Sequence, residues 1–341
     1  MRILIATDAW LPQVNGVVRT MSTVVDGLRA RGHEVEVVGP DRFHTVPCPT
    51  YPEIRLATWP GPTFARIVKA FRPQVLHIVT EAPIGWAAWR WARRRGLPFT
   101  TSYHTRFPEY VQARLKFGIG PCHEILKRFH NAGEATLVAT ASLRDDLAAR
   151  GFTKLTPWTR GVDLERFSPT HRHDWTKAFN VPGPVFINVG RVAVEKNIEA
   201  FLSLDLPGTK IVVGDGPQRA ALQRRFPDTI FTGRLQDRDL ASAFAGGDVF
   251  VFPSLTDTFG LVLLESLACG TPVAGFDVTG PRDIVGKGGA RIGAVGSDLR
   301  AACLAALKAD RAACRPYAEQ YTWAACIDMF ENVLRPFPAP H

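Results

Sequence analysis

Two carboxylates spaced eight residues apart are the first candidates for chemistry. Asp257 and Glu265 lie in the segment SLTDTFGLVLLESLACG, residues 254–270. Glu265 is the lone charge in an apolar run, and an ionised carboxylate in apolar surroundings is costly unless something pairs with it. The pattern predicts a loop that carries Asp257 and a helix that begins near Gly260, whose free N–H groups favour an anion. Together with two carboxylates that bind hydroxyl groups, this site suits a phosphorylated sugar or nucleoside.

Two cationic side chains follow another strand-like run. The segment GRVAVEKN, residues 190–197, begins with Gly190 and places Arg191 and Lys196 five residues apart beside a loop. A guanidinium fork and an ammonium group at this spacing suit two neighbouring phosphates. A pair of solvated surface cations is the alternative interpretation.

A glycine near the N-terminus has a similar setting. In TDAWLPQVNGVVRT, residues 7–20, a strand ends and Asn15–Gly16 precedes a helix. Glycine lets the backbone approach a ligand, and the helix N-terminus favours an anion. An ordinary turn between strand and helix is the alternative, and no G-x-G-x-x-G dinucleotide motif is present here.

Short β-branched runs alternate with helical segments along the chain, which predicts βα units and parallel sheets. The first series of expected strands covers residues 3–6, 35–38, 75–79, 99–103 and 136–139, with helices at about 17–30, 85–95 and 123–132. The second series covers residues 186–189, 210–213, 229–232, 249–252 and 272–276. The fold class is therefore α/β, with two doubly wound, Rossmann-like domains.

The length of 341 residues also favours two domains. A polar stretch at residues 161–184 interrupts the pattern and is typical of an interdomain connection. We predict an N-terminal domain over residues 1–168 and a C-terminal domain over 169–316, with a helix at 317–334 packing back on the first. Ligands of open α/β sheets bind at the carboxyl ends of the strands, so we expect a central cleft there.

Composition limits the function classes. The net charge of +9 favours an anionic partner such as nucleotide phosphates, nucleic acid or an acidic membrane. The six cysteines form no C-x-x-C pair, so we expect reduced thiols and neither a zinc site nor a dithiol redox site. The start MRILIATDAW lacks the features of a signal peptide, and no apolar run reaches the roughly 18 residues of a membrane span. We therefore expect a cytoplasmic protein.

Six motifs in this order resemble the retaining glycosyltransferases of family four, which have the GT-B fold. Besides the three segments above, the motifs are SYHTRFPEY (102–110), RGVDLERFSP (160–169) and VGDGP (213–217). The family's paired acids are usually two glutamates, whereas this chain has Asp257 in the first place. That variation resembles a branch of transferases that act on lipids and mannosides.

The resemblance implies a role for each candidate residue. Glu265 would hold the ribose hydroxyls of a nucleotide sugar, and Asp257 would contact the transferred hexose. Arg191 and Lys196 would neutralise the diphosphate, and His104 would approach the donor sugar. The remaining expected binding residues are Asn15, Gly16, Arg160, Gly190 and the backbone amides of Phe259, Gly260 and Leu261. Residues 232–237 would lie near the base.

The resemblance also bears on cofactors. Retention implies that the acceptor hydroxyl attacks the face the nucleotide leaves, with a donor phosphate oxygen taking the proton. No protein base, cofactor or divalent metal is then expected. The sequence Asp237–Arg238–Asp239 is a D-x-D, a metal motif of another glycosyltransferase fold. Because it opens a predicted helix, N-capping and first-turn charge explain it better.

The acceptor is expected to be a lipid. The helix GWAAWRWARRRG, residues 85–96, combines three tryptophans with four arginines, and residues 111–131 again mix apolar and basic side chains. Such segments suit an anionic membrane surface, although packing on the sheet with solvated arginines is the alternative. We therefore predict peripheral binding to the inner face of the cell membrane and an acceptor such as diacylglycerol. A mannosyl- or glucosyltransferase with a soluble or polysaccharide acceptor is the second interpretation.

Two other classes fit less well. A nucleic-acid-binding protein would explain the charge, but no zinc spacing, recognition helix or aromatic–basic strand motif is found. A two-lobed small-molecule binding protein would normally be exported, and no signal peptide is found.

Overall fold

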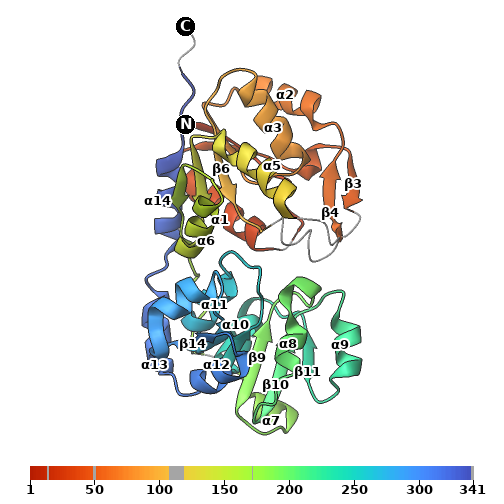
Figure 1. Ribbon diagram of the computed structural model, residues 1–341, viewed down its shortest axis with the longest axis vertical. Coiled ribbons are helices and arrows are strands. Elements are labelled where there is room, and N and C mark those ends of the chain that lie inside the picture. The colour runs from red at the N-terminus through yellow and green to blue at the C-terminus, as the bar shows by residue number, and fades with distance from the viewer. Residues whose placement is uncertain (14, 49–50, 107–118, 171, 339–341) are drawn as a thin grey trace. The chain divides into compact units, whose positions relative to one another are not determined.

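The computed structural model describes residues 1–338, apart from 14, 49–50, 107–118 and 171. The chain forms two compact units, which Figure 1 shows in the colour order of the sequence. Unit 1 consists of Met1–Arg160 with Trp323–His341, and unit 2 consists of Gly161–Thr322.

Unit 1 is built on a six-stranded, fully parallel sheet with the order β2-β1-β5-β6-β7-β8. Its strands are β1 (Arg2–Ala6), β2 (Glu34–Val38), β5 (Val75–Ile78), β6 (Thr100–Tyr103), β7 (Ala135–Val138) and β8 (Leu155–Pro157). Its helices are α1 (Gly16–Ala30), α2 (Pro60–Phe71), α3 (Pro83–Arg93), α5 (Ile119–Asn131), α6 (Ala141–Ala149) and α14 (Trp323–Val333). A hairpin of β3 (Thr45–Cys48) and β4 (Tyr51–Ala57) lies outside this sheet.

Unit 2 repeats the plan with the order β11-β10-β9-β12-β13-β14, again fully parallel. Its strands are β9 (Val185–Val189), β10 (Thr209–Val213), β11 (Ile230–Gly233), β12 (Val249–Phe252), β13 (Val273–Phe276) and β14 (Gly293–Gly296). Its helices are α7 (Trp175–Phe179), α8 (Ile198–Leu202), α9 (Arg219–Arg225), α10 (Asp237–Gly246), α11 (Leu261–Ala268), α12 (Leu299–Ala306) and α13 (Arg311–Ala318). The prediction of two parallel α/β domains is confirmed.

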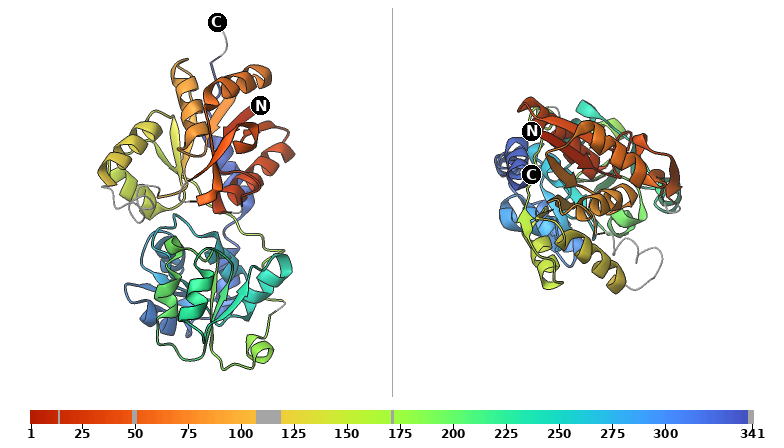
Figure 2. Two further views of the ribbon diagram at one scale, coloured as in Figure 1. Left: turned by 90° about the vertical axis from the view of Figure 1, so that its right-hand side faces the viewer. Right: turned by 90° about the horizontal axis from the view of Figure 1, so that it is seen from above.

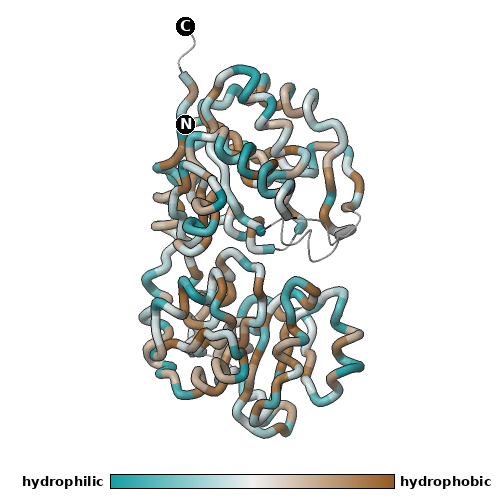
Figure 3. The backbone as a smooth tube through the Cα atoms, in the orientation of Figure 1, coloured by the Kyte–Doolittle hydropathy of each residue, from teal (hydrophilic) through white to brown (hydrophobic). Residues whose placement is uncertain are grey.

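Side-chain alternation along β1 shows how the unit 1 core forms. Ile3 and Ile5 enter the cluster formed with α1 and α14, whereas Leu4 enters the cluster formed with α2 and α3. Both faces of the strand are therefore buried, as expected for a parallel sheet. Figure 2 shows the helices on the two sides of this sheet, and Figure 3 shows hydrophobic and hydrophilic stretches alternating along the backbone.

The predicted strands agree with the observed ones to within a residue or two. Helix α2, the β3–β4 hairpin and the edge strands β8 and β14 were not predicted from the sequence. Within the described residues, no helix is both long and apolar enough to cross a membrane. All six cysteines are free thiols, and Cys269, Cys303, Cys314 and Cys326 are buried.

The unit boundaries differ from the predicted ones. The chain first passes from unit 1 to unit 2 after Arg160 rather than after residue 168. Arg315 of α13 donates hydrogen bonds to the carbonyl oxygens of Leu164 and Phe167, which ties this segment to unit 2. The returning segment begins at Trp323, so residues 317–322 remain with unit 2 while α14 packs in the core of unit 1.

A buried aspartate at the end of β1 holds α3 in place. Asp8 Oδ1 accepts a hydrogen bond from the Ile84 amide (2.9 Å), and Oδ2 accepts one from the Gly85 amide (3.2 Å) and one from the Thr80 hydroxyl (2.9 Å). The carboxylate therefore satisfies N–H groups at the start of α3, where the helix dipole favours negative charge. Burial nevertheless raises the pKa of Asp8 to about 6, more than these hydrogen bonds lower it.

Replacing Asp8 with asparagine should remove the pH dependence of stability that this raised pKa causes. The raised pKa means that the folded state favours the neutral form of Asp8. The contribution of Asp8 to folding stability is therefore fully present below about pH 4 and is lost as the pH rises through about 6. Between about pH 4 and about pH 7.5, wild type should lose about 3 kcal/mol of unfolding free energy relative to Asp8→Asn. Urea unfolding followed by tryptophan fluorescence measures this, because every tryptophan except Trp175 belongs to unit 1. A pH-independent difference between the proteins would contradict the assignment.

Candidate functional site

The carboxyl edge of the unit 2 sheet joins the loops after β9 and β12. Lys196 Nζ contacts Asp257 Oδ1 at 2.7 Å and Oδ2 at 2.9 Å. The side-chain amide of Asn197 donates a hydrogen bond to the Pro253 carbonyl oxygen (3.0 Å). The Ser254 hydroxyl donates one to the Glu195 carbonyl oxygen (3.3 Å). These contacts fix a cation and a carboxylate side by side, and both remain partly exposed.

Glycines allow the neighbouring loops to approach this pair. Gly214 has φ +147°, and a Cβ there would lie 1.8 Å from the Gly190 carbonyl oxygen. The VGDGP segment therefore packs directly on GRVAVEKN, and the Val192 amide donates to the Asp215 carbonyl oxygen. In the same way, a Cβ at Gly280, which has φ +94°, would lie 2.7 Å from the Phe259 carbonyl oxygen.

Helix α11 begins where the sequence predicts it. Gly260 is its N-cap residue with φ +82°, a left-handed conformation that glycine adopts without strain. Glu265 lies on this helix and is only 3% exposed. The structure therefore gathers the predicted unit 2 residues at one sheet edge and its following helix: Gly190, Arg191, Lys196, Asp257, Phe259, Gly260, Leu261 and Glu265.

One residue in this group was missed by sequence analysis. The Thr256 hydroxyl oxygen is buried and has no hydrogen-bond partner among the described residues. It lies next to Asp257 in the same loop. A buried hydroxyl without a partner is costly, and a bound hydroxyl or phosphate oxygen would satisfy it. Only its position after a strand could have indicated it.

The unit 1 candidates form two groups. The Asn15 side-chain oxygen caps α1 by accepting from the amides of Val17 and Val18, both at 3.0 Å, and Gly16 is the first residue of that helix. His104 follows β6, and its ring meets the Trp158 ring edge-on at a centroid distance of 5.5 Å. The Arg160 guanidinium lies 3.9 Å from the centre of the same indole.

This histidine–arginine group is strongly desolvated. Burial, followed by the Arg160 charge, holds the pKa of His104 well below its usual range, so the imidazole is neutral at physiological pH. Burial also lowers the pKa of Arg160 to about 10, which leaves the guanidinium charged. A neutral histidine beside a fixed cation suits contact with a sugar hydroxyl near a phosphate. Residues 107–110 of the SYHTRFPEY motif lie outside the described residues.

Comparison with known proteins decides the family. The chain matches the models "Glycosyltransferase Family 4" over residues 14–166 and "Glycosyl transferases group 1" over residues 183–309. It is 33% identical over 310 residues to a GDP-mannose-dependent alpha-mannosyltransferase of Mycobacterium tuberculosis, covering 84% of this chain and 81% of the relative. The chain belongs to the family 4 glycosyltransferases.

Two further comparisons extend this result for the glycosyltransferase. It is 26% identical to an alpha-monoglucosyldiacylglycerol synthase of Streptococcus pneumoniae, over 80% of this chain and 70% of the relative. A solved sucrose-phosphate synthase from Thermosynechococcus elongatus superposes with a TM-score of 0.72 at 20% identity, over 97% of each chain. The predicted GT-B fold is confirmed.

The D-x-D of the glycosyltransferase lies in the first turn of α10. The N-cap residue of α10 is Gln236, so neither aspartate caps the helix, whereas Asp237 and Asp239 both place negative charge in its first turn, as predicted. Asp237 pairs with Arg166 at 3.4 Å. Among the described residues, no group of three or more His, Cys, Asp or Glu side chains is arranged to hold a metal ion.

The tryptophans of α3 pack against the core of unit 1 of the glycosyltransferase. Trp86, Trp89 and Trp91 are half-buried and pack against the cluster that contains Phe129. The Trp89 indole N–H donates to the Phe129 carbonyl oxygen (3.1 Å), and Arg90, Arg93 and Arg95 lie over the three rings. Packing therefore accounts for these rings. The second expected membrane segment, 111–131, is described only from residue 119 onward.

Lys196→Gln tests the cationic part of the site. Removing the ammonium group should weaken binding of UDP or GDP by about tenfold or more, because charge-assisted bonds to phosphate are lost. Isothermal titration calorimetry with both nucleotides measures the affinity. Lys177→Gln, an exposed lysine on α7, is the matched control. Equal affinity of Lys196→Gln and wild type would contradict the predicted role of Lys196.

Proposed function

We propose that this glycosyltransferase moves a hexosyl group from a nucleotide sugar to the hydroxyl of a lipid such as diacylglycerol, with retention at the anomeric carbon. The observation that carries the proposal is the Lys196–Asp257 pair beside the N-terminus of α11. The donor would be UDP-glucose, UDP-glucuronate or GDP-mannose.

The position of this pair supports a nucleotide site. Lys196 follows β9 and Asp257 follows β12, and these are the neighbouring strands at which the order β11-β10-β9-β12-β13-β14 reverses. Connections leave such strands in opposite directions, so a crevice opens between their loops, and open α/β sheets bind ligands there. Gly214 packs against the carbonyl oxygen of Gly190, the residue that directly follows β9.

Each residue then has a role that its chemistry allows. Lys196 and Arg191 would neutralise the diphosphate, with the amides of Phe259, Gly260 and Leu261 adding N–H donors at the start of α11. Asp257 would release part of its contact with Lys196 and accept hydrogen bonds from the hexose. Glu265 would hold the ribose hydroxyls. The group as a whole would stabilise the charge that develops on the leaving nucleoside diphosphate.

We further propose that these cations make a divalent metal unnecessary. No dedicated protein base is needed when a phosphate oxygen of the donor takes the acceptor's proton. Turnover should accordingly persist in excess EDTA.

One of these relatives supports a lipid acceptor, because it is named alpha-monoglucosyldiacylglycerol synthase. The mannosyltransferase relative is named for GDP-mannose, which supports that donor. A soluble or polysaccharide acceptor is the second candidate, because the name of the more similar relative specifies no lipid.

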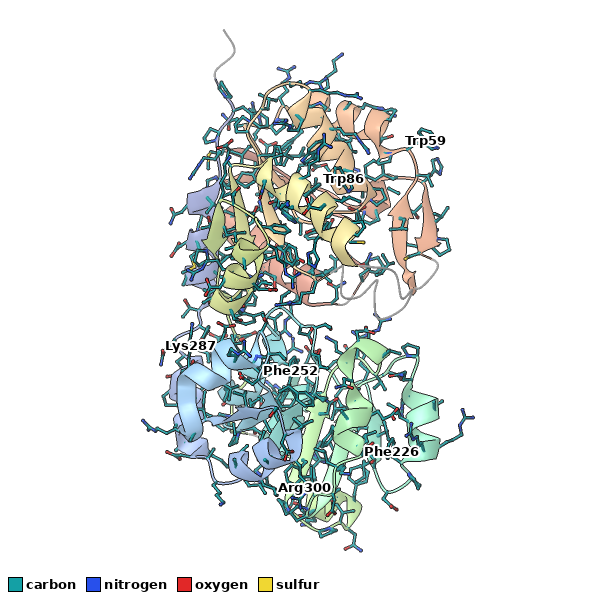
Figure 4. The ribbon with its side chains drawn as sticks, in the orientation of Figure 1. Trp59, Trp86, Phe226, Phe252, Lys287 and Arg300 are labelled. Atoms are coloured by element: carbon teal, nitrogen blue, oxygen red, sulfur yellow. The ribbon has the colours of Figure 1, made fainter. Side chains whose placement is uncertain are left out.

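A surface of unit 1 supports binding to an anionic membrane. Trp59 precedes α2 and is 91% exposed, and Figure 4 shows its side chain at the outer edge of unit 1. Val46 of the β3–β4 hairpin is 49% exposed. Residues 57–100 contain a single carboxylate, Glu81, and seven cations: Arg66, Lys69, Arg72, Arg90, Arg93, Arg94 and Arg95. An exposed indole in a stretch of the chain that is rich in cations fits an interface with anionic lipids, so we propose peripheral attachment at the inner face of the cell membrane.

A donor and acceptor screen tests the proposed function. Purified protein is offered UDP-glucose, UDP-glucuronate, UDP-galactose and GDP-mannose, each with diacylglycerol in anionic vesicles or with methyl α-mannoside or methyl α-glucoside in solution. We expect a glycolipid from one donor, and Glu265→Gln should reduce its formation at least about a hundredfold while the protein stays folded. Glu199→Gln, an exposed glutamate on α8, is the control. Transfer only to soluble glycosides would favour the second candidate, and no consumption of any donor would refute the proposal.

Trp59→Ala tests membrane attachment separately. Loss of the indole should weaken partition into phosphatidylglycerol-containing vesicles by about tenfold, measured by co-sedimentation. Phe179→Ala removes a ring of unit 2 that is 46% exposed, and it should have no effect. Unchanged partition in Trp59→Ala would exclude this residue as a membrane contact.

A further inference from the structure

The unit 1 sheet has its own reversal point, and two carboxylates follow it. In the order β2-β1-β5-β6-β7-β8, the sequence direction reverses between β1 and β5. Asp8 lies just after β1, and Glu81 lies just after β5. Such a point is where an open α/β sheet offers room for a ligand. Because Asp8 is committed to Thr80 and the start of α3, Glu81 is the carboxylate that remains for a ligand.

A buried histidine fixes the Glu81 carboxylate. Glu81 Oε1 lies 2.8 Å from His130 Nε2, and His130 Nδ1 lies 2.9 Å from the Thr101 hydroxyl. The His130 side chain is 0% exposed, and its ring lies 5.4 Å from that of Tyr103 and 5.2 Å from that of Phe129. The histidine is therefore held on all sides and gives Glu81 a defined position.

The other oxygen of Glu81, Oε2, differs from Oε1 in its contacts. Within the described part of the chain, Oε2 takes no hydrogen bond or ion pair. The Glu81 side chain is 11% exposed, so it is not fully sealed in the core. A carboxylate that is held at one oxygen and leaves the other without a partner resembles a binding group more than a packing group.

We propose that Glu81 Oε2 accepts a hydrogen bond from the hydroxyl of the bound acceptor, which makes Glu81 a residue that determines acceptor binding. This inference rests on the proposed function and adds the acceptor's place in unit 1. A phosphate would be repelled by Glu81 and Asp8, whereas a neutral hydroxyl donates to a carboxylate. The acceptor is therefore recognised through an alcohol group, as in diacylglycerol or a sugar.

The transfer step makes and breaks no bond to Glu81. The bond from the anomeric carbon to the phosphate oxygen breaks, and a new bond forms from that carbon to the acceptor oxygen. The hydroxyl proton passes to the leaving phosphate oxygen, so Glu81 holds the acceptor before transfer and takes no part in the proton transfer.

Glu81→Gln is the direct test. The glutamine oxygen can still accept from His130, while the negative charge and the Oε2 acceptor are lost. We expect the acceptor KM to rise about tenfold to a hundredfold, with nucleotide affinity and Tm unchanged. The acceptor is whichever of diacylglycerol in anionic vesicles, methyl α-mannoside or methyl α-glucoside the wild type glycosylates. Glu34→Gln, an exposed glutamate at the opposite, amino end of the same sheet, is the control.

A second variant guards against a folding defect. Glu81→Asp keeps the charge but withdraws the carboxylate, and its acceptor KM should lie between those of wild type and Glu81→Gln. If Glu81 only supports His130, both variants will lower Tm and leave the acceptor KM unchanged, and that result would overturn the inference. Wild-type turnover separates this from the proposed function, which fails only if wild type itself consumes no nucleotide sugar.

Discussion

The parallel arrangement of both sheets is the constraint on which the site chemistry depends. Because all described strands of each six-stranded sheet run in one direction, their carboxyl ends meet at one edge. In each sheet the strand order reverses at a single place, β1/β5 in unit 1 and β9/β12 in unit 2. Residues far apart in sequence, such as Lys196 and Asp257, meet there because the sheet order makes their strands neighbours.

Charge compensation differs between the two edges. In unit 2 the Asp257 carboxylate is matched by a flexible ammonium group, which can be shared with an incoming phosphate. In unit 1 each carboxylate is hydrogen-bonded to a group that is fixed in the fold. For Asp8 this group is the N-terminus of α3, and for Glu81 it is the buried imidazole of His130. A rearranging pair suits the binding of an anion, whereas a fixed carboxylate suits the orientation of a neutral hydroxyl.

Elements with a local residue pattern could be predicted from the sequence, whereas elements that depend on contacts between distant residues could not. The buried strands read as apolar runs, and Gly260 marked the start of α11 correctly. The hairpin near Val46 was missed because its strands pair only with each other and leave that side chain exposed. Glu81 and His130 lie 49 positions apart, and no local pattern links them. The α3 tryptophans were ambiguous because packing and membrane contact require the same amphipathic spacing.

Asp8 shows why a costly group can persist beside a site. Its burial disfavours the ionised form, so above about pH 6 it carries a charge that the fold tolerates at a loss of stability. In return, one carboxylate joins the end of β1 to Thr80 and to the start of α3. An asparagine could not replace all three contacts, because its amide nitrogen would face other N–H donors. Asp8 therefore ties the chain after β1 to the chain after β5, the two strands between which the order of the unit 1 sheet reverses.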